Sequence, residues 1–206
     1  MSPTCFSAPK DFCTFTLYVL AVYQDIQEKV REEVNRFMKD DGTLAYDDVG
    51  KLDYLDMVFC EVLRKYPPGF RQERVCTKDY NDPETGLFVP KGTLVAIPMY
   101  SFHNDKQYFD NPDKFDPEHF TPENKAKRHN YSFMPWGYGP RSCLGMRLAL
   151  IECKSFICHI VHRFSNRANR ENSNSNQNRQ STPPTNASSR FGVEIYCFVN
   201  RMITGN

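Results

Sequence analysis

Three features are scarce in this sequence of 206 residues: long apolar runs, an excess of one charge, and closely spaced cysteines. The main apolar run, residues 12–23, is too short to span a bilayer. It also follows Lys10 and Asp11 rather than a basic leader, which argues against a signal segment. The run therefore predicts the buried end of a helix.

The charges nearly cancel, with 26 Lys and Arg against 25 Asp and Glu, for a formal charge of +1. Neither sign dominates a long stretch, so the composition indicates neither a nucleic-acid-binding tail nor an acidic tail. We therefore expect no nucleic-acid partner. Any other partner has to be inferred from a specific site.

The eight cysteines lack the tight spacing of small disulfide-stapled domains, so we expect mostly reduced thiols. A zinc site built from Cys153, Cys158, His159 and His162 is one alternative, since residues four apart can share a helix face. Against it, Cys153 lies on an apolar helical stripe, and no CxxC pair is present.

Hydrophobic spacing predicts a mainly α fold with small β-sheets (α+β). Helices are expected over residues 25–39, 54–66 and 146–163, the second ended by two prolines. Short β-branched segments at 87–89 and 93–97 predict strands.

The remaining segments divide the chain. Residues 103–135 show no sustained period and predict an ordered meander of aromatic and polar residues. Residues 165–190 are rich in Asn and Ser and predict disorder, because they bury too little apolar surface to offset the entropy of ordering. We therefore expect one partial domain over 1–164, the disordered tract over 165–190, and a C-terminal strand of the same domain within 191–206.

The surroundings of Cys143 suggest a site for a flat ligand. A cysteine at a helix N-terminus is favoured as thiolate, a soft metal ligand. Gly137, Gly139 and Gly145 remove side chains that would keep such a ligand from the backbone, and Arg141 could pair with a carboxylate on its edge. A haem has this shape, charge and metal. The alternative is a buried structural cysteine beside ordinary turn glycines.

Residues 136–145, WGYGPRSCLG, read aromatic-x-x-Gly-x-Arg-x-Cys-x-Gly and resemble the cysteine-loop signature of the haem-thiolate monooxygenases, the cytochrome P-450 superfamily. Upstream, Glu61 and Arg64 lie in a Glu-x-x-Arg pattern similar to that superfamily's conserved-motif helix. Residues 117–120, Pro-Glu-His-Phe, are similar to its Pro-Glu-Arg-Phe stretch with His119 in place of arginine. We expect a neutral imidazole there to give a weaker network than guanidinium.

The resemblance extends from about Leu17 to Phe164 and again, more weakly, over Phe191 to Arg201. It looks like the branch of microsomal family-three drug and steroid hydroxylases and thromboxane synthase. It implies the C-terminal, haem-ligating portion of the P-450 fold, binding haem b (iron protoporphyrin IX). The implied roles are iron ligand and catalytic residue for Cys143, haem contacts for Arg74, Trp136, Gly137, Arg141 and Gly145, and a structural ion network for Glu61, Arg64 and His119.

The implied reaction inserts one oxygen atom of O2 into a lipophilic substrate, with electrons from an NADPH-dependent reductase. The implied location is the cytosolic face of the endoplasmic reticulum membrane. Ser7 and Ala8 stand where the superfamily has its acid–alcohol pair, so we expect an N-terminally truncated form. The alternatives are a catalytically inactive haem-binding fragment and a thromboxane-synthase-like haem-thiolate isomerase.

Trp136 departs from the phenylalanine that the superfamily usually places beside the ligating sulfur. One interpretation is a larger aromatic plug. The other is that the indole N–H donates to the sulfur of Cys143 and raises the haem reduction potential.

Overall fold

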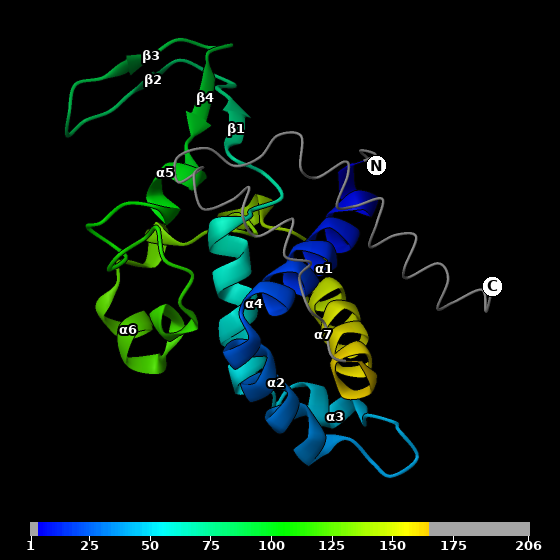
Figure 1. The fold of residues 1–206 in the computed structure, drawn as a ribbon. Coiled ribbons are helices and arrows are strands. Elements are labelled where there is room, and N and C mark those ends of the chain that lie inside the picture. Colours follow the sequence, from blue (N-terminus) through cyan, green and yellow to red (C-terminus); the bar gives the residue numbers. More distant parts are fainter. Residues whose placement is uncertain (1–3, 165–206) are drawn as a thin grey trace.

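Four helices, α1, α2, α4 and α7, enclose the main apolar core of the computed structural model, which describes residues 4–164 (Figure 1). The α-helices are α1 (Thr4–Val22), α2 (Gln24–Phe37), α3 (Tyr46–Val49), α4 (Asp53–Lys65), α5 (Met99–His103), α6 (Pro122–Lys127) and α7 (Met146–Arg163). Short 3-10 helices are η1 (Pro117–Phe120), η2 (Asn130–Ser132) and η3 (Gly139–Arg141). The strands are β1 (Gln72–Val75), β2 (Tyr80–Asn81), β3 (Phe88–Val89) and β4 (Leu94–Ile97).

The core forms because each long helix presents an apolar stripe to its neighbours. On α2, residues at intervals of four, Ile26, Val30 and Val34, are buried. The matching stripe of α7 includes Ile157 and Val161, both fully buried. Helix α4 lies between these helices and the meander that follows α5, so one element touches both the core and the polar region beyond it.

Two small antiparallel sheets project from the helices in Figure 1. Strand β1 pairs with β4 from Gln72 opposite Ile97 to Val75 opposite Leu94. Strands β2 and β3 form the outer two-stranded sheet.

The expected fold class, mainly α with small β-sheets, is confirmed, as are the three predicted helices and the two predicted strands. Residues 103–135 do form a meander, but it contains η1, η2 and the six-residue α6, which the sequence pattern did not indicate. Residues 165–190 and 191–206, expected to be a disordered tract and a strand, lie outside the described residues. The division of the chain into these parts stays a prediction.

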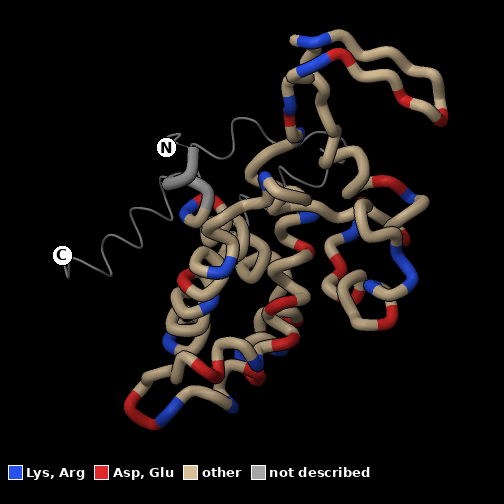
Figure 2. The backbone as a smooth tube through the Cα atoms, turned by 180° about the vertical axis from the view of Figure 1, so that it is seen from behind, with Lys and Arg blue, Asp and Glu red and all other residues tan. Residues whose placement is uncertain are grey.

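Within residues 4–164, no helix has the length and apolarity needed to cross a bilayer. Figure 2 shows Lys and Arg interspersed with Asp and Glu along the backbone, in keeping with the balanced composition.

Candidate functional site: a cysteine loop and a buried ion network

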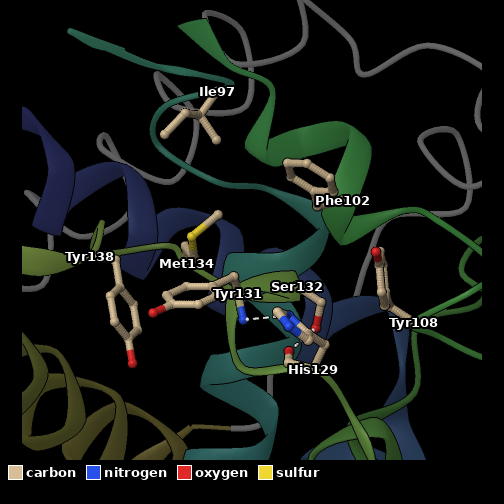
Figure 3. Close-up of a pocket in the computed structure, with 8 residues that line it drawn as sticks. All are labelled: Ile97, Phe102, Tyr108, His129, Tyr131, Ser132, Met134 and Tyr138. Atoms are coloured by element: carbon tan, nitrogen blue, oxygen red, sulfur yellow. Dashed lines mark hydrogen bonds between the residues drawn. The ribbon is translucent and has the colours of Figure 1, made fainter. Parts of the chain in front are cut away.

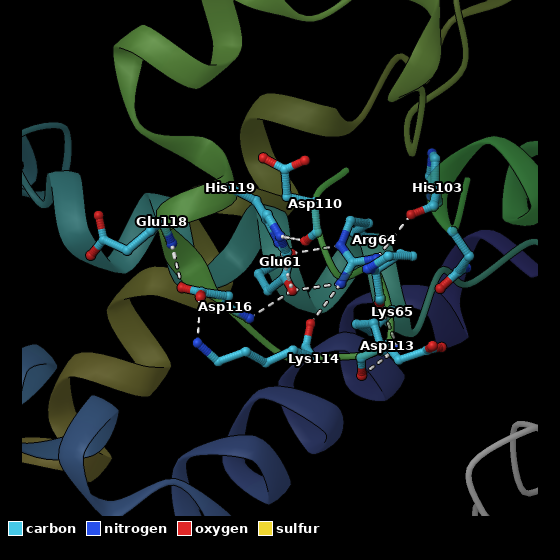
Figure 4. Close-up of polar contacts among 12 residues, drawn as sticks. Glu61, Arg64, Lys65, His103, Asp110, Asp113, Lys114, Asp116, Glu118 and His119 are labelled. Atoms are coloured by element: carbon cyan, nitrogen blue, oxygen red, sulfur yellow. Dashed lines mark hydrogen bonds and ion pairs between the residues drawn. The ribbon is translucent and has the colours of Figure 1, made fainter. Parts of the chain in front are cut away.

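Glu61 and Arg64 lie one turn apart on α4 and form a pair with two hydrogen bonds (Figure 4). The Arg64 Nε and Nη2 atoms donate to the two carboxylate oxygens of Glu61, each at 2.7 Å. Both side chains are 0% exposed. A charge pair this enclosed is tolerated only if its remaining donors and acceptors also find partners.

Those partners are main-chain atoms of the meander. Arg64 Nη1 donates to the carbonyl oxygen of His103 at 2.9 Å, and Nη2 donates to that of Lys114 at 3.1 Å. The Asp116 N–H donates to Glu61 Oε1 at 2.9 Å. The ion pair therefore anchors three points of the meander to α4.

His119 completes the network from η1. Its Nδ1 lies 3.3 Å from both oxygens of Glu61, and its Nε2 lies 2.6 Å from the carbonyl oxygen of Asp110. Both neighbours are acceptors, so the imidazolium, with a proton on each nitrogen, suits this position. Burial opposes the charge, but the hydrogen bond and the charge of Glu61 outweigh it and raise the pKa of His119. The raised pKa shifts His119 toward its charged form, whereas only a neutral imidazole was considered at this position from the sequence.

A pH dependence follows from this raised pKa. The contribution of His119 to stability is fully present below the unfolded-state pKa of about 6.5 and is lost as the pH rises through the higher folded-state value. We expect the difference in free energy of unfolding between the wild type and His119→Gln to shrink as the pH rises from below 6 toward 8 or so. Urea unfolding across this range measures it, and a difference that is constant with pH would contradict the charged form.

The loop that carries Cys143 is closed by main-chain hydrogen bonds. The Gly137 N–H donates to the carbonyl of Met134 at 3.0 Å, and the Cys143 N–H donates to that of Trp136 at 2.8 Å. Gly137 and Gly139 both have φ of +74°, in the left-handed region that favours glycine. The loop therefore has a defined backbone conformation around an exposed thiol.

The sequence placed Cys143 just before a helix expected to start at Met146, and the structure has this start. Helix α7 begins at Met146 with Gly145 as its N-cap, so Cys143 lies two residues before the cap. The effect of the helix dipole is concentrated in the first turn, so it contributes less to this thiol than the sequence suggested.

Strand β1 lies against this loop. A Cβ atom on Gly137 would come within 2.4 Å of the Gln72 amide nitrogen, so a side chain there would displace Gln72. Because side chains two apart on a strand share a face, Arg74 belongs to the same face of β1 as Gln72. No hydrogen bond or ion pair joins Arg74 to Arg141 or Cys143 within residues 4–164; Arg74 donates to the carbonyl of Glu73 at 2.8 Å instead.

Trp136 is half-buried, and its side chain packs against the apolar core. In the described part of the chain, its indole N–H makes no hydrogen bond to the sulfur of Cys143. The contact between the two residues is the main-chain hydrogen bond from Cys143 to Trp136. This arrangement favours the aromatic plug over the hydrogen-bond donor.

The loop fits a flat ligand that bonds to sulfur. Residues 138–145 are all exposed, and no atom lies within 4 Å of where a Cβ would stand on Gly139 or Gly145. The side chains of Leu144, which follows Cys143, and Leu148, in the first turn of α7, are also exposed. They add apolar surface to the segment that carries the thiol. A haem would use each of these features: the thiol as a ligand of its iron, the open space beside the glycines for its flat ring, and the apolar and arginine neighbours for its faces and carboxylates.

A separate hollow of about 430 Å³ lies beside the loop (Figure 3). Its lining residues are Ile97, Phe102, Tyr108, His129, Tyr131, Ser132, Met134 and Tyr138. The rings of Tyr131 and Tyr138 meet edge to face, with centroids 4.6 Å apart. Cys143, Arg74 and Arg141 do not line it, so the hollow is distinct from the face that presents the thiol.

The proposed zinc ligands on α7 do not converge. His159 Nδ1 contacts the carbonyl of Ser155, and His162 Nδ1 contacts the side chain of Asn35. In the portion that the structure describes, no three His, Cys, Asp or Glu side chains are grouped closely enough to hold a metal ion. The arrangement does not support the zinc alternative.

Sequence reasoning missed His103, which joins the network to the loop, and Gln72, which lies beside Gly137. His103 and Gln72 lie in segments without a recognisable motif. Their neighbours in space lie far away in the sequence, so no local pattern could identify them.

Comparison with known proteins places these features in a family. The family model described as Cytochrome P450 matches residues 13–191. Curated relatives include Cytochrome P450 3A31 of Mesocricetus auratus at 44% identity, Cytochrome P450 3A2 of Rattus norvegicus at 45%, and Cytochrome P450 3A7 of Homo sapiens at 42%. Each alignment covers 152 residues, which is 74% of this chain and 30% of the relative, so the chain spans less than a third of these relatives' length.

Proposed function

The chain belongs to the cytochrome P450 family, and on this basis we propose that it carries the haem-ligating portion of a monooxygenase, with Cys143 as the thiolate ligand of the iron. The observation that carries the proposal is the exposed thiol in a loop closed by main-chain hydrogen bonds, with open space beside Gly139 and Gly145. The resemblance of residues 136–145 to the family signature supports the same assignment.

The proposed ligand is haem b, which when bound supplies the redox chemistry that inserts one oxygen atom of O2 into a lipophilic substrate. Arg141 and Arg74 are exposed cations suited to its propionates, because guanidinium pairs strongly with carboxylate. Gly145 leaves open space beside the loop, Gly137 lets the side chain of Gln72 approach the loop backbone, and Trp136 fixes the loop to the core. We propose Gly137 and Gly145 as haem contacts together with Trp136. Cys143, as the ligand, is the one catalytic residue in this set.

Glu61, Arg64 and His119 serve the reaction indirectly, by fixing the meander that leads to the loop. Their charges are buried and paired, so they are not placed to exchange protons with a substrate. We assign them a structural role.

The partners proposed by family membership are an NADPH-dependent reductase, O2 and a lipophilic small molecule, at the cytosolic face of the endoplasmic reticulum membrane. The proposed organisation is one domain over residues 1–164, with 191–206 returning to it after the tract 165–190.

Reconstitution with haem tests the ligand assignment. The reduced, carbon-monoxide-treated chain should show the red-shifted Soret band of thiolate ligation. An unshifted band of the kind given by imidazole ligation would refute Cys143 as the ligand.

A further inference from the structure

His103 touches both halves of the site. It is the last residue of α5 and its side chain is fully buried. Its carbonyl oxygen accepts a hydrogen bond from Arg64 Nη1 at 2.9 Å, and its ring Nε2 accepts the main-chain N–H of Met134 at 3.1 Å. One residue therefore connects the buried ion network to the start of the cysteine loop.

From Met134 the connection continues along the loop. The Met134 carbonyl accepts the N–H of Gly137, and the carbonyl of Trp136, the residue before Gly137, accepts the N–H of Cys143. We propose that His103 is a positioning residue for Cys143, with its ring nitrogen fixing the backbone of the loop that presents the thiol.

The proposal requires one form of the ring. Nε2 can accept from Met134 only if it carries no proton, so the neutral ring must carry its proton on Nδ1. Burial and the nearby charge of Arg64 lower the pKa of His103 to about 4, and Arg128 acts in the same direction, so the ring stays neutral at physiological pH. His103 is thus an uncharged acceptor, in contrast to His119, whose pKa is raised.

The buried ring of His103 leaves its Nδ1 donor unpaired in the described part of the chain, and this unfavourable feature supports a specific role for Nε2. Nδ1 is buried and has no hydrogen-bond partner among residues 4–164. A buried donor without a partner is unfavourable, so an apolar side chain would suit this position better if packing were its only task. The bond from Met134 is the interaction that an apolar side chain could not replace.

Substitutions at His103 separate the acceptor from the bulk of the ring. His103→Leu removes the acceptor, whereas His103→Gln offers an amide oxygen near the position of Nε2. Lys154→Met is the matched control, because it breaks the buried contacts of Lys154 with the Val49 carbonyl and Asp56, which involve no residue of the loop. None of these variants changes a residue assigned to haem binding.

Amide hydrogen exchange of the full chain without haem measures the outcome. In His103→Leu, exchange at Met134, Gly137 and Cys143 should rise about tenfold relative to the amides of α4. In His103→Gln it should stay within about threefold of the wild type, and in Lys154→Met the loop should not be selectively affected. Equal effects of Leu and Gln, or no loop-specific effect of Leu, would overturn the proposal.

A second measurement needs no variant, so it decides the matter even if His103→Leu does not fold. Nitrogen NMR of the wild type should show His103 with an unprotonated Nε2 and a coupling across the hydrogen bond to the Met134 amide. A proton on Nε2 would overturn the proposal. The inference rests on the proposed function only in taking Cys143 as the haem ligand, and both readouts are made without haem, so the two can fail separately.

Discussion

Cys143→Ala is expected to abolish the red-shifted Soret band of the haem-loaded, reduced chain under carbon monoxide. The shift depends on electron donation from a thiolate, and alanine has no atom that can coordinate iron. The thiol is exposed, and its sulfur makes no hydrogen bond to the rest of residues 4–164. The free energy of unfolding should therefore change by no more than about 0.5 kcal/mol, so the loss of the band cannot be attributed to unfolding.

Cys76→Ala is the matched control for this experiment. Cys76 is a second free cysteine, at the end of β1, and its thiol contacts the carbonyl oxygen of Lys78. This variant should keep the shifted band. A Cys143→Ala protein with an intact band, or a Cys76→Ala protein without one, would show that another thiol is the ligand.

The helices were predictable because their apolar residues recur at helical spacing. The spacing of Ile26, Val30 and Val34 on α2 indicated both the helix and its buried face. The pairing of Glu61 with Arg64 could also be predicted, since residues three apart share a helix face. Their burial was implied only by the family resemblance, because no local spacing reveals the meander that covers them.

The loop and the meander were less predictable, for two physical reasons. Main-chain carbonyls, such as those of His103 and Lys114, leave no mark in the amino-acid sequence, although they accept the remaining hydrogens of Arg64. The approach of Gln72 to Gly137 and the hydrogen bond from Met134 to the ring of His103 also join residues far apart in the sequence, which no local spacing indicates. The part taken by His119 was predicted from the family resemblance alone, and the upward shift of its pKa depends on contacts with Glu61 and Asp110 that the sequence does not show.

A buried ion pair does not by itself imply high stability, because removing two charges from water can cost as much as their attraction returns. What distinguishes Glu61 and Arg64 is the number of main-chain groups that they also satisfy: two carbonyls and one N–H of the meander. The pair is therefore better described as an anchor for residues 103–116 than as a gain in stability from the charges themselves.

Arg64→Leu tests this description and is expected to lower the free energy of unfolding by about 3–5 kcal/mol, because it leaves the carboxylate of Glu61 buried without its guanidinium partner. Adding Glu61→Leu removes that charge, but the main-chain groups stay unpaired, so the double variant should recover only part of the loss.

Lys51→Met is the control for that test, since Lys51 is exposed where it pairs with Asp48 and its loss should leave the free energy of unfolding nearly unchanged. Urea unfolding of the four proteins gives the comparison. Full recovery in the double variant would mean that the network matters only through its charges. Partial recovery, with increased amide exchange in residues 103–116, would identify the main-chain contacts as the reason that two charged side chains are buried between α4 and the meander.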